Sequence, residues 1–425
     1  MSVEMKDSGI DWIGYIPMHW EVTRLKNVFC EYNVKSENGT ETLLSLSQYT
    51  GVKPKSETEL AGSHEAESYE GYKIVKAGQL VMNIMLAWNG SYALSDYDGM
   101  ISPAYCIYDF RTVCHKKYFH YLLRIDGYPS AFKTMSRGII DSRLRLYPEQ
   151  FYTFNTVVPP IEEQSRIANF LDKKCAEIDE LIALQEQMIA QLNTYKQAVI
   201  TETVTKGLDP NVKMKDSGVE WIGEIPEHWD KDKIIRMFKT IGSGTTPKST
   251  EDSNFQGTIN WLQSGDINGN IITESKHKIS LETLKEYSVL KIYKAPFIVV
   301  AMYGASVGNI SISDIDACVN QACCVMSNSK HDFRFLFYTI KSAKNYLIYR
   351  AVGGGQPNIS QDTLKNLWLP NPPLSEQQFI AQYLDQKCKG IDELISIKKG
   401  KIEHLKAYKK SVIYEYVTGK KQVTI

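Results

Sequence analysis

Two long segments of the chain repeat apolar residues at the spacing of an α-helix. The first spans 162–206, contains no proline or glycine, and has a heptad row of apolar residues that starts at Leu171 and Ile178. The second spans 375–418 and has a matching row that starts at Leu384 and Ile391. A proline precedes each segment and a glycine follows it, as helix start and stop signals do. A helix of this length is about 65 Å long, too long for one small core and typical of a coiled coil.

Elsewhere the chain alternates short apolar runs with Gly, Asn, Asp and Ser turns, which is the pattern of mixed strands and short helices. The apolar runs Gln79–Leu86 and Phe297–Met302 are predicted strands. The segments Lys117–Arg124 and Phe333–Ala351 are predicted helices, the second because its apolar residues recur at three- and four-residue spacing. These parts of the chain are therefore expected to form globular domains of mixed α/β structure.

An internal repeat organises these elements. Residues 5–20 and 214–229 are identical at twelve of sixteen positions, at an offset of 209. Residues 171–182 and 384–395 are identical at nine of twelve positions, at an offset of 213. The interiors of the two copies share little that can be aligned by eye. A duplication that keeps its frame but not its interior predicts two modules of one architecture with different specificities.

The two long segments carry opposite charge. Residues 162–206 hold five basic and eight acidic side chains, whereas 374–421 hold ten basic and six acidic ones. Complementary charge favours pairing of the two helices with each other, and the module between them makes antiparallel pairing the natural connection. We therefore expect an α+β fold of two mixed α/β domains separated by two long antiparallel coiled-coil helices, with internal pseudo-two-fold symmetry. The expected boundaries are 1–158 and 207–371 for the domains, and 159–206 and 372–425 for the helices.

Composition excludes several classes of protein. The chain has 425 residues, and 43% of them are hydrophobic, which is ordinary for a globular protein. No apolar run is long enough to span a bilayer, and the N-terminus lacks a basic region followed by an apolar core, so we expect a cytoplasmic protein. The eight cysteines form no Cys-x-x-Cys pair, so we expect no metal site.

No convincing catalytic set emerges from the residues. The segment Asn371–Leu374 resembles the Asn-Pro-Pro-aromatic loop of amino-methyltransferases, but Leu374 stands where the aromatic residue would stack on a flipped base. The loop Ile241–Lys248 partly resembles a phosphate-binding loop but lacks the Gly-Lys-Ser/Thr ending. Both this loop and the later Gly353–Asn358 could contact an anion or could be simple turns. The sequence therefore favours a binding protein over an enzyme.

The charge map points to a nucleic-acid partner, although the chain as a whole has no net charge. Residues 111–145 carry a net charge of +6 and residues 330–350 carry +4, and the two windows lie at similar places in the repeat. Lys and Arg there would neutralise phosphates, and Arg can also contact guanine edges. A solvated helix face is the alternative for either window. The candidate DNA-contacting residues are Lys116, Lys117, Lys133, Arg137, Arg143 and Arg145 in the first copy, and Thr245, Thr246, Lys248, Lys341, Lys344, Arg350, Gln356 and Asn358 in the second.

The repeated motifs resemble those of the specificity subunit of bacterial and archaeal type I restriction–modification enzymes, over nearly the whole chain. The motifs that carry the resemblance are Trp12-Ile13-Gly14 with Ile16-Pro17 and Trp20, their copies Trp221-Ile222-Gly223 with Ile225-Pro226 and Trp229, and the helix starts at Pro159-Pro160 and Pro372-Pro373. Motifs inside the modules are also similar to the family's patterns, among them Ala87-Trp88-Asn89-Gly90, Ser243-Gly244-Thr245-Thr246-Pro247, Asn320-Gln321-Ala322 and Gln356-Pro357-Asn358-Ile359-Ser360.

This resemblance implies two target-recognition domains, each of which reads one half of a split, double-stranded DNA site. It implies that the long helices dock two methyltransferase (modification) subunits, to which restriction subunits are added. The chain itself would be non-catalytic and would bind no cofactor, because S-adenosylmethionine, ATP and Mg²⁺ would belong to the partner subunits. The candidate docking residues are Leu171, Ile178, Leu181, Leu192, Leu384, Ile391, Leu394 and Leu405.

Three alternatives stay open on the sequence. The chain could serve a related modification system, or a combined cutting and modifying one, without separate restriction subunits. It could be a DNA methyltransferase that acts alone, although no glycine-rich cofactor loop is evident. It could also be a coiled-coil scaffold with no role in DNA binding, which the two basic windows oppose.

Overall fold

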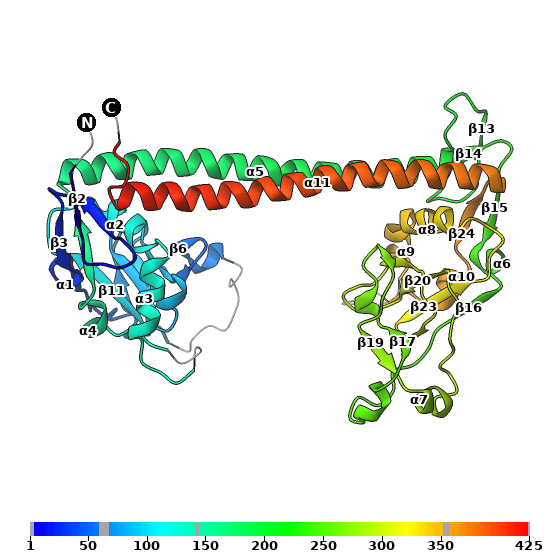
Figure 1. Ribbon diagram of the computed structural model, residues 1–425, viewed down its shortest axis with the longest axis horizontal. Helices are drawn as coiled ribbons and strands as arrows, with labels where there is room; N and C mark the ends of the chain where they lie inside the picture. The colour runs from blue at the N-terminus through cyan, green and yellow to red at the C-terminus, as the bar shows by residue number, and fades with distance from the viewer. Residues whose placement is uncertain (1–3, 59–67, 141–143, 352–357, 424–425) are drawn as a thin grey trace. The chain divides into compact units, whose positions relative to one another are not determined.

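The chain forms two compact units. The structure is a computed structural model, and it describes residues 4–58, 68–140, 144–351 and 358–423. Unit 1 comprises Met1–Gln185 together with Gly400–Ile425, and unit 2 comprises Glu186–Lys399. Each unit therefore contains one end of each long helix, and each is described by itself below (Figure 1).

Unit 1 is built on a four-stranded antiparallel sheet with the order β4-β11-β8-β9. Strand β12 pairs with β3 just before the first long helix begins. The elements of this unit before the long helix are β1 Met5–Asp7, β2 Tyr15–Pro17, β3 Glu21–Arg24, α1 Leu25–Val28, β4 Phe29–Glu31, β5 Leu44–Ser47, β6 Gly51–Pro54, β7 Lys73–Val75, β8 Leu80–Asn83, β9 Tyr92–Leu94, β10 Gly99–Ile101, β11 Tyr105–Phe110, α2 Lys116–Leu123, α3 Gly127–Met135, α4 Pro148–Phe151 and β12 Asn155–Val158.

Unit 2 is built on a five-stranded mixed sheet with the order β16-β23-β20-β21-β18, and a second sheet has the order β19-β17-β22. Strand β24 pairs with β15 just before the second long helix, as β12 pairs with β3 in unit 1. The elements of unit 2 are β13 Met214–Asp216, β14 Glu224–Pro226, β15 Asp230–Lys233, α6 Ile234–Met237, β16 Thr240–Gly242, β17 Ile259–Leu262, β18 Ile271–Ile272, β19 His277–Ile279, α7 Leu281–Glu286, β20 Phe297–Ala301, β21 Ile310–Ser313, β22 Cys318–Val319, β23 Cys323–Ser327, α8 Phe333–Ser342, α9 Lys344–Tyr349, α10 Gln361–Lys365 and β24 Trp368–Asn371.

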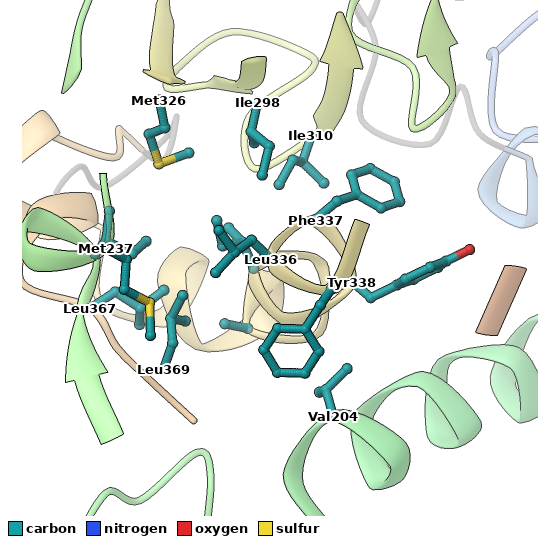
Figure 2. Close-up of a cluster of buried hydrophobic side chains, with 14 of the residues drawn as sticks. Val204, Met237, Ile298, Ile310, Met326, Leu336, Phe337, Tyr338, Leu367 and Leu369 are labelled. Carbon is teal, nitrogen blue, oxygen red and sulfur yellow. The ribbon is translucent and has the colours of Figure 1, made fainter. Parts of the chain in front are cut away.

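The main core of unit 2 surrounds helix α8. Figure 2 shows Leu336 of this helix among apolar side chains that include Ile298, Ile310 and Met326 of the sheet, and all of them are buried. Val204, from the first long helix, belongs to the same buried cluster. Helix α8 therefore buries apolar side chains against both the sheet and a long helix, and the packing fixes its position between them.

The two long helices are α5, Ile161–Lys206, and α11, Leu374–Val417. Each begins directly after a Pro-Pro pair, and the backbone of Gly207, just after α5, has a φ of 77°, in the left-handed region that glycine adopts easily. In unit 1, Asp179 of α5 binds Lys409 of α11 at 2.7 Å. In unit 2, Lys196 of α5 binds Asp392 of α11 at 2.6 Å.

These two ion pairs are related by the repeat, since both members shift by the same number of positions. Further contacts give the direction of the pairing, because Phe170 stacks on Tyr416 in unit 1 and Lys398 contacts the sulfur of Met188 in unit 2. Contacts on α11 move toward its N-terminus as those on α5 move toward its C-terminus, so the helices are antiparallel within each unit. The expected fold class, two mixed α/β domains with two long antiparallel helices, is confirmed.

One predicted helix is wrong in detail. The segment Phe333–Ala351 forms two helices, α8 and α9, because the backbone leaves helical geometry at Ala343, where φ is −78° and ψ is 0°. Ile340 of α8 and Leu347 of α9 both belong to the main core of unit 2. The break lets both helices bury an apolar face in one core, which periodicity alone does not predict.

The packing around α8 predicts a large stability effect. Leu336→Ala removes a side chain that is fully buried, so we expect the free energy of unfolding of unit 2 to fall by about 2–5 kcal/mol in a urea titration. The matched control is Leu281→Ala in α7, where the side chain is 53% exposed and the expected change is within about 0.5 kcal/mol. Equal effects of the two substitutions would contradict this description of the core.

Candidate nucleic-acid interface and docking surfaces

A buried tryptophan joins each N-terminal hairpin to the first turn of a long helix. In unit 1 the indole nitrogen of Trp20 donates to the carboxylate of Glu163 at 2.9 Å, and His19 Nε2 lies 2.7 Å from the other carboxylate oxygen. The ring of Trp20 is 1% exposed, so this hydrogen bond satisfies its one buried polar atom. Unit 2 repeats both contacts with Trp229, His228 and Glu376. His19 and His228 therefore contact the carboxylate that binds the indole in their own unit.

A second set of hydrogen bonds attaches one short helix of each unit, α2 in unit 1 and α8 in unit 2, to a long helix; we call these two the basic helices. In unit 1 Lys117 and Tyr121 of α2 donate to the carboxylate of Asp172 at 2.6 and 2.7 Å. In unit 2 Arg334 and Tyr338 of α8 donate to Asp385 at 2.7 and 2.8 Å. The repeat therefore places a cation and a tyrosine of the basic helix on the same carboxylate of the long helix in both units.

The predicted basic residues of unit 1 are exposed, and two of them come together. The backbones of Arg137 and Arg145 exchange two hydrogen bonds of 2.9 Å, so the two residues lie opposite each other at the base of the same loop. The ammonium of Lys133 lies 4.9 Å from the ring of Trp88. Lys116 is exposed near the ring of Phe110. Arg143 lies outside the described residues.

The predicted loop Ile241–Lys248 of unit 2 makes polar contacts with two glutamines. The Thr246 hydroxyl donates to Gln321 Oε1 at 2.6 Å, and Gln361 Nε2 donates to the hydroxyl of Ser243 at 2.9 Å. Thr245 lies in the same loop, and Lys248 pairs with Glu251 at 3.5 Å. Asn358 and Arg350 are exposed, and Gln356 lies outside the described residues.

Gln321 and Gln361 are residues that the sequence prediction missed. Their amides lie beside the predicted Ser/Thr loop only because the fold brings together segments far apart in the chain. Gln321 is the middle residue of the motif Asn320-Gln321-Ala322, and that motif was the available signal for it. Amide and hydroxyl groups of this kind can donate to and accept from base edges in the major groove.

Two further predicted residues, Lys341 and Lys344, are only half-exposed. Lys344 donates to Asn309 Oδ1 at 2.8 Å. Lys341 lies in a hollow of about 850 Å³ whose lining contains basic and acidic side chains, and burial together with the nearby Lys196 lowers the pKa of its ammonium. Since Lys196 and Arg334 in that lining are already paired with Asp392 and Asp385, the hollow is a mixed-charge surface.

The long helices expose apolar side chains at positions related by the repeat. Leu181 and Leu184 on α5 are 47% and 43% exposed, and their counterparts on α11, Leu394 and Ile397, are 49% and 65% exposed. Tyr408 of α11 is 50% exposed. It precedes Lys409, which pairs with Asp179, two residues before Leu181. Its counterpart Tyr195 is 48% exposed beside Lys196. Each unit therefore presents a similar apolar face on its helix pair.

The predicted docking residues divide into three groups by exposure. Leu171, Ile178, Leu384 and Ile391 are at most 5% exposed and pack within their own units. Leu192 and Leu405 are half-buried, whereas Leu181 and Leu394 are exposed. The predicted docking residues did not include Leu184, Tyr195, Ile397 and Tyr408, which contribute to the exposed faces.

Possible metal ligands and thiols lie in the part of the chain that the structure describes. In the described ranges, no cluster of three or more His, Cys, Asp or Glu side chains could hold a metal ion. Burial raises the pKa of the Cys318 thiol to about 11, and it raises those of Cys323 and Cys324 to about 12. Within the same described ranges, no helix is both long enough and apolar enough to cross a membrane.

Comparison with known proteins identifies similar sequences. Residues 226–407 match the sequence family "Type I restriction modification DNA specificity domain". The type I restriction enzyme MjaVIII specificity subunit of Methanocaldococcus jannaschii is 28% identical over 428 residues, which cover 96% of this chain and 94% of that protein. The putative MjaX specificity subunit of the same organism is 28% identical over 310 residues, or 72% of this chain and 68% of that protein.

Solved structures share the fold. The HsdS subunit from Thermoanaerobacter tengcongensis aligns over 96% of this chain and 98% of its own, with a TM-score of 0.53 and 18% identity. A chain from a study of complex assembly and conformational transition of the type I R-M system aligns over 95% of this chain and 98% of its own, with a TM-score of 0.72 and 18% identity. At this level of identity the likeness concerns the fold.

The buried cysteines give a direct test of the packing of unit 2. Because burial raises the pKa of Cys318, Cys323 and Cys324 to about 11 or 12, these thiols are protonated at pH 8 and poor nucleophiles. We expect iodoacetamide to leave the peptide that contains them unmodified in the native protein and to alkylate it in urea, as measured by mass spectrometry. Rapid alkylation of that peptide in the native protein would contradict the buried positions.

Proposed function

Because the chain belongs to the family of type I restriction–modification specificity subunits, we propose that it reads a split DNA site, one half with each unit. Proteins of this family are non-catalytic, DNA-recognising parts of type I complexes. We assign target recognition to residues 1–158 and 207–371, and subunit docking to 159–206 and 372–425. One observation carries the proposal. The two units share the contacts that join them to the long helices, such as Trp20 to Glu163 and Trp229 to Glu376, which we call the frame contacts, but they present different candidate surfaces.

The candidate surfaces differ in chemistry, which supports two different half-sites. In unit 1, Arg137 and Arg145 lie opposite each other, and guanidinium groups bind phosphates and the O6 and N7 atoms of guanine. In unit 2, Thr246, Gln321 and Gln361 supply hydroxyl and amide groups, and amides pair well with adenine edges. An asymmetric target follows from this difference.

The partners follow from the repeated apolar faces of the long helices. Two similar faces, each with two aliphatic side chains and one tyrosine, suit two copies of one partner. We propose that this partner is the methyltransferase subunit, and that restriction subunits are added to the resulting complex. S-adenosylmethionine, ATP and Mg²⁺ are then bound by the partner subunits, and this chain contributes recognition and assembly.

Substitutions in the two candidate surfaces should affect different half-sites. We expect Arg137→Ala with Arg145→Ala to weaken binding of the assembled complex to one half-site by roughly ten- to hundredfold, because contacts to bases are lost. Thr246→Ala with Gln321→Ala should weaken binding to the other half-site only. The measurement is a competition assay with duplexes in which one half-site at a time is scrambled.

Each double variant is the control for the other, since both keep the frame contacts of their unit. Loss of methyltransferase binding in either variant would contradict the assignment of these residues to DNA. An equal loss at both half-sites would contradict the division of the target between the units.

The length of the paired helices should set the gap between the half-sites. We propose a variant with seven residues inserted after Gln185 in α5 and seven after Lys399 in α11, so that both helices grow by one heptad. At 1.5 Å per residue this adds about 10 Å, or about three base pairs at 3.4 Å each. We expect the methylated motif of the variant to keep both half-sites and to gain about three unread base pairs. An unchanged gap in an active complex would contradict this role of the helices.

A further inference from the structure

The two apolar faces of the long helices are alike at one end only. We define stripe 1 as Arg166, Phe170, Lys174, Glu177, Leu181 and Leu184 of α5, and stripe 2 as Phe379, Tyr383, Lys387, Gly390, Leu394 and Ile397 of α11. Their members recur every three or four residues, which places each stripe along one side of its helix. Corresponding members lie 213 positions apart. The last two members of each stripe are the exposed aliphatic side chains described above.

The other end of stripe 1 is polar or covered. Arg166 is an exposed cation, and the ring of Phe170 packs on Tyr416 with 4.4 Å between ring centroids. Lys174 and Glu177 form an ion pair of 3.1 Å on the helix surface. A partner that covers this end must desolvate charged groups for little apolar contact.

The corresponding end of stripe 2 is apolar and open. Phe379, the counterpart of Arg166, is 65% exposed, and Tyr383 is 39% exposed. Gly390 replaces Glu177, and a Cβ added there would meet no atom within 4 Å. Lys387 lies with its ammonium 5.7 Å from the ring of Tyr195, so its stem continues the apolar surface. Stripe 2 thus presents an apolar face of about 27 Å along the helix.

The hollow beside stripe 2 is larger than the hollow beside stripe 1. In unit 1 the hollow beside Arg166 measures about 120 Å³, and Glu163 and Lys421 also line it. In unit 2 the equivalent hollow beside Phe379 measures about 420 Å³. Glu376, the counterpart of Glu163, lines it together with Lys206 and Asp209, and Leu208 and Val212 add apolar surface. Charged side chains line both hollows, but the second is larger and has Phe379 where the first has Arg166, so it has more room and more apolar surface for a large apolar side chain of a partner.

We propose that the two methyltransferase subunits bind with unequal affinity, and that the first one docks on stripe 2 with an apolar side chain in the hollow beside Phe379. This inference rests on the proposed function, which supplies the identity of the partner. The shared ends of the stripes let one partner fit both. The additional aromatic surface, of the kind that dominates binding energy at interfaces, favours stripe 2. Assembly therefore passes through a complex with one methyltransferase subunit on unit 2.

The test is a titration of the full chain with the isolated methyltransferase subunit, followed by calorimetry and native mass spectrometry. We expect two dissociation constants that differ by roughly tenfold or more. Phe379→Arg, which places the residue type of stripe 1 in stripe 2, should weaken the tighter site by about that factor and leave the weaker one unchanged. Leu181→Asp should abolish the weaker site and leave the tighter one.

Gln378→Ala is the matched control for Phe379→Arg, because Gln378 is an exposed neighbour outside the stripe, and it should change neither constant. Phe379→Arg should also leave thermal unfolding unchanged, since the side chain is largely exposed. Two equal sites, or loss of the tighter site in Leu181→Asp, would overturn the inference and leave the proposed function intact. Failure of the wild-type chain to bind any methyltransferase subunit would overturn both.

Discussion

Both units depend on a hydrogen bond between a buried indole and a carboxylate in the first turn of a long helix. Trp20 donates to Glu163, and Trp229 donates to Glu376. A buried indole nitrogen without an acceptor would be costly, so this bond fixes where each helix begins relative to its N-terminal hairpin. The same carboxylate is also hydrogen-bonded to a histidine, so one glutamate side chain holds two residues at the start of each unit. The recognition surfaces can then vary while the frame that carries them stays the same.

The division of labour within each unit follows from this frame. Asp172 and Asp385 hold helices α2 and α8 on the long helices through Lys117 and Arg334, and we propose that the exposed loops contact DNA. We propose that the arginine pair of unit 1 and the amide and hydroxyl groups of unit 2 read different half-sites, although both units share the same contacts to the long helices. The long helices expose similar aliphatic side chains in both units, and we propose that these bind two copies of one partner and that Phe379 makes the two docking sites unequal.

The sequence predicts the parts of this structure that are local or repeated. Prolines and glycines mark the ends of α5 and α11, and the repeated motifs locate the joints, because these features depend on neighbouring residues. A heptad row does not reveal which side of a helix a module covers, so Leu171 and Leu384 were predicted as docking residues although they are buried. The contacts of Gln321 and Gln361 depend on long-range folding, and the exposure of Phe379 depends on which side of α11 the rest of the unit covers.

The central claim is that this chain alone determines which DNA is modified, with one half-site per unit. The most direct measurement is methylome sequencing of a host that expresses the partner methyltransferase with and without an intact copy of this chain. The account predicts a split, asymmetric methylated motif that is present only when the chain is present. A motif that persists without the chain, in a host where the complex is shown to assemble and be active, would contradict it.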